Sequence, residues 1–175
     1  MIKKKKNSII IYSAIIIAIF ALLYHLESPE AKTDSKVSTF LKQYEGEKGI
    51  TVLKVPDFLL GELIKNDSLN ISKSSFKSFR IMILHEKQNE NRTCDETEKK
   101  LMGFLDSLQF QPLLDNGRTD SARMKIYTKK AVNPWKENVP LYTSDSTLFL
   151  FNFITDINDD QVKKFSDYLS TENLL

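Results

Sequence analysis

The residues best suited to chemistry lie in one acidic stretch near the C-terminus. Asp156, Asn158, Asp160 and Asp167 stand at the first, third, fifth and twelfth places of a run. This spacing resembles a calcium loop, in which carboxylate and amide oxygens surround the ion. However, Gln161 replaces the glycine of the sixth place, and the twelfth place is not a bidentate glutamate. Capping of a helix is the alternative, and we prefer it to a metal site.

Histidine and cysteine are too scarce for most metal or nucleophile sites. The chain has two histidines and one cysteine. His85-Glu86 resembles the start of a zinc-protease helix, but Asn89 stands where the second histidine is needed. Cys94 and His85 form the one nominal nucleophile pair, and Cys94 falls within a predicted helix cap, where an inert thiol is expected. We therefore predict no enzyme and no cofactor.

The loop at Pro134 and Trp135 is a candidate partner contact. Trp135 is the single tryptophan of the chain, and tryptophan is enriched in interface hot spots. The alternative is that its ring folds back over the sheet edge as part of the core.

Charge is distributed unevenly along the chain. The formal net charge is +2, but Lys3, Lys4, Lys5 and Lys6 precede a long apolar run. Taking these four from the 25 basic residues leaves 21 against 23 acidic residues, a balance of −2 for the remainder. No basic footprint for nucleic acid is left, so nucleic acid is not an expected partner.

The apolar run predicts a membrane anchor over residues 8–26. A bilayer core of about 30 Å needs about 20 helical residues, and Ile9, Ile16, Phe20 and Leu23 are among the apolar residues that would meet the lipid. The lysines predict a cytoplasmic basic tail over residues 1–7, with the remainder across the membrane. A cleaved signal peptide that releases the protein is the alternative, but the run exceeds roughly 15 residues and lacks a small-residue cleavage site.

Residues 27–34 predict a short linker, and residues 35–175 a single soluble α+β domain. Apolar spacing predicts helices over 37–44, 58–64, 93–108 and from 158 or 159 to 169. It predicts strands over 50–55, 79–84, 122–130, 139–143 and 147–155. Thr93 and Glu96 fit a capping box, and Asp115-Asn116-Gly117 predicts a turn.

Two strands carry the prediction of the fold. In Ala122–Lys130, Met124 alternates with basic neighbours, which predicts one face in water and hence an antiparallel sheet. Thr147–Thr155 is apolar on both sides, which predicts a central strand. We expect a two-layer domain, a mostly antiparallel sheet with helices on one face.

Four stretches resemble a small bacterial envelope family, the domain-of-unknown-function family numbered 4252. They are FLKQYEGEKGITVLKVPDFLLGEL (Phe40–Leu63), FRIMIL (Phe79–Leu84), LMGFLDSLQFQPLLDNGRTDSARMKIYTKK (Leu101–Lys130) and LFLFNFITDINDDQVKKFSDYL (Leu148–Leu169). One departure is Thr155, where the family tends to have glycine. The resemblance implies an exported or membrane-attached small domain and no catalytic residues.

Together these features predict a single-pass protein of the bacterial inner membrane, with its C-terminal domain in the periplasm. Its expected partners are the lipid bilayer, through residues 8–26, and an unknown envelope protein. The expected function is that of a non-enzymatic accessory or protein-interaction module. The alternative is a periplasmic domain that binds a small ligand, a lipid or an ion.

Overall fold

The computed structural model describes residues 35–64, 69–89, 92–119, 122–130, 134–144 and 146–170. The predicted basic tail, membrane anchor and linker, residues 1–34, lie outside the described residues. Within the described ranges, no helix has the length and apolar character needed to cross a membrane.

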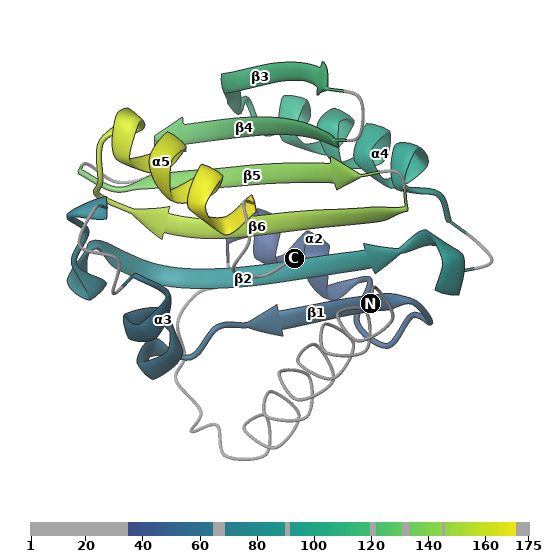
Figure 1. The fold of residues 1–175 in the computed structure, drawn as a ribbon, viewed down its shortest axis with the longest axis horizontal. Coiled ribbons are helices and arrows are strands. Elements are labelled where there is room, and N and C mark those ends of the chain that lie inside the picture. Colours follow the sequence, from purple (N-terminus) through teal and green to yellow (C-terminus); the bar gives the residue numbers. More distant parts are fainter. Residues whose placement is uncertain are drawn as a thin grey trace, which may run out of the picture. The chain divides into compact units, whose positions relative to one another are not determined.

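A six-stranded sheet forms the centre of the domain (Figure 1). Its strands are β1 (Ile50–Lys54), β2 (Phe76–His85), β3 (Gln111–Thr119), β4 (Ala122–Lys130), β5 (Lys136–Ser144) and β6 (Thr147–Thr155). They are ordered β1-β2-β6-β5-β4-β3, and every neighbouring pair is antiparallel. The predicted α+β class and antiparallel sheet are confirmed. So is the central place of β6, which is buried at most of its positions.

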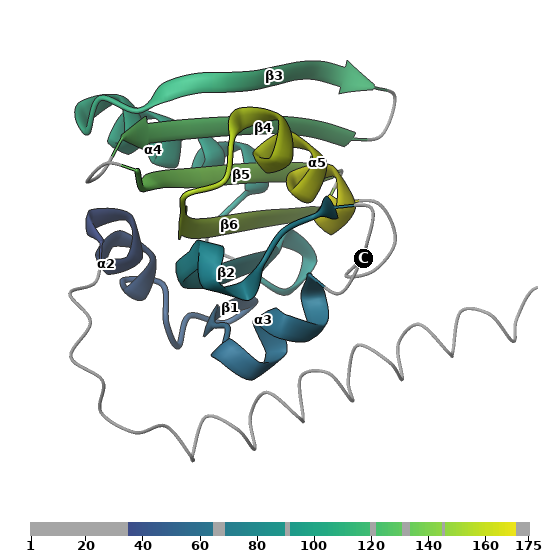
Figure 2. The same cartoon turned by 90° about the vertical axis from the view of Figure 1, so that its left-hand side faces the viewer.

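Helices cover both faces of this sheet. They are α2 (Lys36–Lys42), α3 (Asp57–Leu63), α4 (Cys94–Ser107) and α5 (Asp159–Ser170), with short 3-10 turns η2 (Lys73–Ser75) and η3 (Glu86–Gln88). Figure 1 shows α5 in front of the sheet and α2 and α4 behind it, and Figure 2 shows the same arrangement from the side. The predicted two-layer domain with helices on one face is therefore wrong.

The alternation of β6 explains why both faces need a cover. Leu148 and Leu150 pack in one core with α2 and α4. Phe149, Phe151 and Phe153 pack in a second core with α3 and α5. Because successive side chains of a strand point to opposite faces, a strand that is apolar throughout requires a layer on each side. We call these sides the α2/α4 face and the α3/α5 face.

The predicted wet face of β4 is also wrong, since α4 covers it. Tyr127 is buried in the α2/α4 core, and its basic neighbours Arg123, Lys125 and Lys129 are all partly buried. Lys129 Nζ donates to the carbonyl of Leu108, just after the end of α4. A long basic side chain can be covered by a helix when an acceptor receives its charged end.

The turn predicted at residues 115–117 lies inside β3, so that prediction is wrong. The pairing of β3 with β4 shifts register between Pro112 and Leu114 and again between Asn116 and Thr119. Extra residues in one strand of a pair form bulges, where glycine and proline are tolerated. The sequence signal for a turn here therefore coincides with an irregular strand.

Candidate functional site

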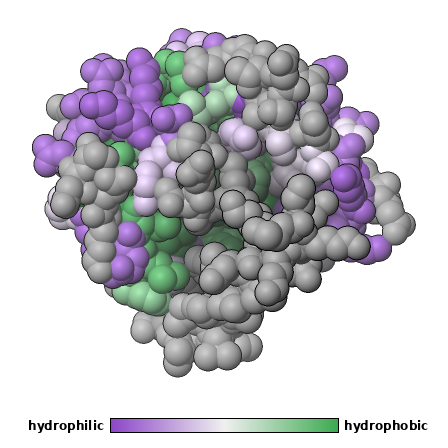
Figure 3. Space-filling view, viewed as in Figure 1, coloured by the Kyte–Doolittle hydropathy of each residue, from purple (hydrophilic) through white to green (hydrophobic). Residues whose placement is uncertain are grey.

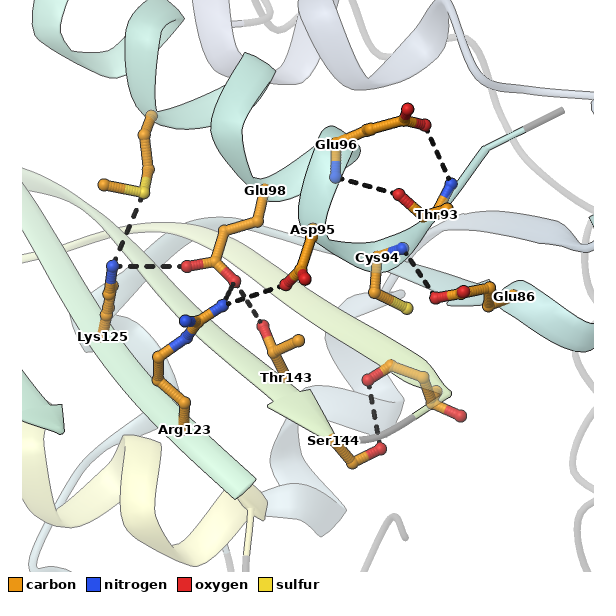
Figure 4. Close-up of polar contacts among 12 residues, drawn as sticks. Glu86, Thr93, Cys94, Asp95, Glu96, Glu98, Arg123, Lys125, Thr143 and Ser144 are labelled. Atoms are coloured by element: carbon orange, nitrogen blue, oxygen red, sulfur yellow. Dashed lines mark hydrogen bonds and ion pairs between the residues drawn. The ribbon is translucent and has the colours of Figure 1, made fainter. Parts of the chain in front are cut away.

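A group of charged side chains is buried between α4 and the sheet, and sequence reasoning did not single it out. Glu98 lies on the same side of α4 as Leu101 and Leu105, so it faces inward with them, and it is 3% exposed. Its carboxylate accepts from Arg123 and, at 2.9 Å, from the Thr143 hydroxyl. Figure 4 shows these side chains converging from α4, β4 and β5.

Lys125 completes this cluster on the second carboxylate oxygen. Its Nζ lies 3.3 Å from Glu98 Oε1 and 3.6 Å from Met102 Sδ. Arg123 also lies 3.5 Å from the exposed Asp95. The cluster therefore contains two cations and two anions. A buried carboxylate is tolerated when both oxygens are paired in this way. The arrangement suits fixing α4 on the sheet.

The start of α4 is capped as the sequence predicts. Thr93 Oγ1 accepts from Glu96 N at 3.1 Å, and Glu96 Oε2 accepts from Thr93 N at 3.3 Å. A carboxylate from η3 adds to this cap, because Cys94 N donates to Glu86 Oε2 at 2.9 Å. Side chains thus accept hydrogen bonds from three backbone N–H groups at the start of α4.

Cys94 and His85 do not form a nucleophile pair in this arrangement. Burial raises the pKa of the Cys94 thiol to about 12, and the neighbouring Glu86 side chain contributes to this rise. His85 Nδ1 instead lies 3.4 Å from Thr147 Oγ1. A protonated, buried thiol is a poor nucleophile, which agrees with the expected inert cysteine.

The acidic stretch predicted as a weak metal candidate forms the start of α5. Asn158 Oδ1 accepts from Gln161 N at 2.9 Å, and Gln161 Oε1 accepts from Asn158 N at 3.2 Å. This reciprocal pair is a capping box, as the preferred interpretation predicts. Asp156 and Asp160 are exposed.

Asp167 lies further along α5, and it too is exposed. Throughout the described ranges, no three His, Cys, Asp or Glu residues are grouped so that they could hold a metal ion.

Pro134 and Trp135 lie just before β5, and neither belongs to the two apolar cores. Pro134 is exposed and Trp135 is half-buried. Lys77 Nζ, from β2, stands 4.0 Å from the centroid of the indole ring. Such a cation–π contact holds the ring at the surface. The half-buried ring fits either a lid over the sheet edge or a partner contact, and both stay predictions.

A second polar cluster holds α2 on the sheet and was also missed. Asn152 is fully buried within the otherwise apolar β6. Its Oδ1 accepts from Ser38 Oγ at 2.9 Å, and its Nδ2 donates to Glu137 Oε1 at 2.8 Å. The signal was present in the sequence, because an amide inside a strand that is buried on both faces must find partners.

Comparisons with protein-family models, with curated proteins and with solved structures find no match for this chain.

Proposed function

We propose that this protein is a membrane-anchored, non-enzymatic accessory module whose folded domain faces the periplasm and contacts an envelope protein. The observation that carries the proposal is that the buried carboxylate of Glu98 is paired within its own cluster. The two oxygens of Glu98 are occupied by Arg123, Lys125 and Thr143. The polar residues best suited to chemistry thus hold the fold together, and the outer surface is what remains for function.

The sequence supports the membrane location. The apolar run with Lys3–Lys6 before it has the pattern of an uncleaved signal anchor, and residues 27–34 would tether the domain near the bilayer. The resemblance to exported small domains of unknown function agrees with this location.

Crosslinking in intact cells through a C-terminal tag tests the proposal. We expect one abundant membrane-fraction partner, which is lost when Ile9–Leu26 is exchanged for a cleavable signal sequence. A matched variant that replaces the anchor with an unrelated transmembrane helix should keep the partner, because tethering alone is required. If the tagged protein is monomeric and captures no protein, the accessory role is refuted, and thermal-shift screening should then test for ligand binding.

A further inference from the structure

The two edge strands of the sheet differ in how regular they are. β3 carries Pro112 and two register shifts against β4. β1 pairs with β2 at each of its five residues without a shift, and it contains no proline. Bulges and proline protect an edge strand from pairing with another chain. Of the two edges, therefore, only β1 lacks these protective features.

Hydrogen bonds at both ends of β1 establish which backbone groups point outward. Gly49 O accepts from His85 N at 2.9 Å, and Val55 N donates to Phe79 O at 2.8 Å. In an antiparallel ladder every second residue bonds to the same neighbour. Thr51 and Leu53 therefore bond to β2, while the N–H and C=O groups of Val52 and Lys54 point to the open edge. No further strand pairs there among the residues that the structure describes.

The charges around β1 indicate what kind of partner would fit. Lys54 is exposed at one end of the strand, and Lys87 is exposed in η3, beyond the other end. The nearby acids Glu45 and Glu47 are already ion-paired, at 3.3 Å with Arg80 and at 2.8 Å with Arg92. The exposed Asp57 offsets part of the charge beyond Lys54, so the positive charge is greater at the Lys87 end. This favours an acidic partner over a second copy of the same strand, which would bring lysines together.

An exposed apolar side chain follows this edge shortly along the chain. Phe58, in the first turn of α3, is 54% exposed, and it is the single large exposed hydrophobic residue among those described. In the space-filling view, hydrophobic surface gathers at the lower left, the part in which Figure 1 places α3 (Figure 3). Because β1 ends at Lys54 and α3 begins at Asp57, Phe58 follows the open edge directly along the chain.

We propose that the outer edge of β1, together with Phe58, is the docking surface for an extended, acidic segment of a partner protein. The segment would add to the sheet as a further strand, bonding to the backbone of Val52 and Lys54. Its acidic ends would meet Lys54 and Lys87, and an apolar residue would meet Phe58. This inference rests on the proposed accessory function and names its contact surface.

Two proline substitutions distinguish the outward-pointing from the inward-pointing backbone N–H groups of β1. Val52→Pro removes an outward N–H and no ladder bond, so the fold should persist, as edge strands tolerate proline in that position. Thr51→Pro, the matched control, removes an inward N–H and should lower the melting temperature. The probe is a fluorescein-labelled peptide of alternating threonine and valine with aspartate at both ends, added to the full chain in detergent micelles.

Fluorescence anisotropy should show that the probe binds the unmodified chain and that Val52→Pro weakens binding at least about tenfold. Lys54→Glu should weaken it about threefold. A peptide with lysine at both ends should not bind. Equal binding by the unmodified chain and Val52→Pro, or no binding by either, would overturn the proposal.

Amide hydrogen exchange supplies a readout that needs no substitution. In the full chain, Val52 and Lys54 should exchange fast while Thr51 and Leu53 are protected, and the aspartate-ended peptide should slow Val52 and Lys54. Protection that appears at β3 instead refutes this docking surface. If a cellular partner is captured but leaves the β1 amides unprotected, the accessory function stands and the β1 inference fails. If no partner is captured, the accessory function fails, and peptide binding still decides whether the edge accepts a strand.

Discussion

The two faces of the sheet hold their helices by different means. On the α3/α5 face, Phe165 of α5 lies among Phe76, Phe79 and Phe153, with ring centroids 5.3–6.0 Å apart. On the α2/α4 face, two polar groups are buried within an apolar core, Glu98 in α4 and Asn152 beneath α2. The α3/α5 face therefore depends mainly on shape and area, with one partly exposed ion pair between Lys136 and Asp159 at the start of α5. The α2/α4 face adds charged contacts that are buried.

The two kinds of contact contribute differently, one to the stability of helix packing and the other to the position of the helix on the sheet. Burial of aromatic rings stabilises a layer strongly but allows some freedom of position. A carboxylate with three fixed donors permits one register, because any shift leaves a buried charge without its partner. The polar contacts of the α2/α4 face thus specify the placement of α2 and α4, and rings of the α3/α5 face supply stability.

The largest expected effect tests the aromatic face. Phe165→Ala should lower the free energy of unfolding by about 4 kcal/mol, since it removes a fully buried ring and leaves a cavity. Phe165→Leu keeps most of the volume and should cost about 1 kcal/mol. Urea unfolding of the full chain, followed by Trp135 fluorescence, measures both. Similar losses for the two variants would show that this face is not governed by volume.

On the α2/α4 face, by contrast, a substitution that keeps the shape of a side chain but removes its charge should be costly. Glu98→Gln is nearly isosteric, yet it should cost about 3 kcal/mol because it leaves Lys125 without a counter-charge and Arg123 with the exposed Asp95 alone. The same urea unfolding provides the value. A loss below about 1 kcal/mol would mean that water, reaching the partly exposed Arg123, already compensates for the cations.

A triple replacement serves as the control for Glu98. Glu98→Leu with Arg123→Met and Lys125→Met removes the charges together, and most of the lost stability should return. If the triple variant is also less soluble or less uniquely folded, the cluster contributes specificity of packing rather than stability.

Asn152→Ala should have a smaller effect, about 2 kcal/mol. It leaves Ser38 and Glu137 without the amide that joins them, and both lie at least partly buried. Ser38→Ala removes one bond only and should cost about 1 kcal/mol. A double-mutant cycle on these two residues, measured by urea unfolding, should show coupling. If the two losses of stability simply add, the two side chains do not interact.

Much of the fold was predictable because it follows from local patterns. Three such patterns depend on neighbouring residues alone. They are the apolar run of β6, the helical spacing of Leu101 and Leu105, and the Thr93–Glu96 cap. The number of layers was predicted wrongly, because the basic residues of β4 were interpreted as solvent-facing. Their acceptors, Glu98 and the end of α4, lie about 20 or more residues away in the chain, and no local pattern reveals such a partner.

The candidate site was harder to predict for the same reason. A cap at the start of α5 was predictable, since Asn158 and its partner Gln161 are three residues apart. Glu98 was not predicted to be buried, because a glutamate on a helix usually faces solvent. Its position three residues before Leu101 was the available signal, since that spacing places it on the apolar side.

The smallest expected effect comes from pH and again concerns the α2/α4 face. Burial raises the pKa of Cys94 from 9.0 to about 12, so the folded state holds this proton more tightly than the unfolded state. The contribution to stability is complete below about pH 9 and is lost as pH rises toward 12. At pH 10 the loss should be on the order of 1 kcal/mol relative to neutral pH.

Cys94→Ala isolates this effect from other titrating groups. Its free energy of unfolding should fall less steeply between pH 8 and 10 than that of the unmodified chain, with the difference measured by urea unfolding at each pH. In addition, the native thiol should react slowly with a disulfide reagent at pH 8 and rapidly in urea. Because Cys94 belongs to the α2/α4 core, a fast native reaction would show that this face opens in the folded protein.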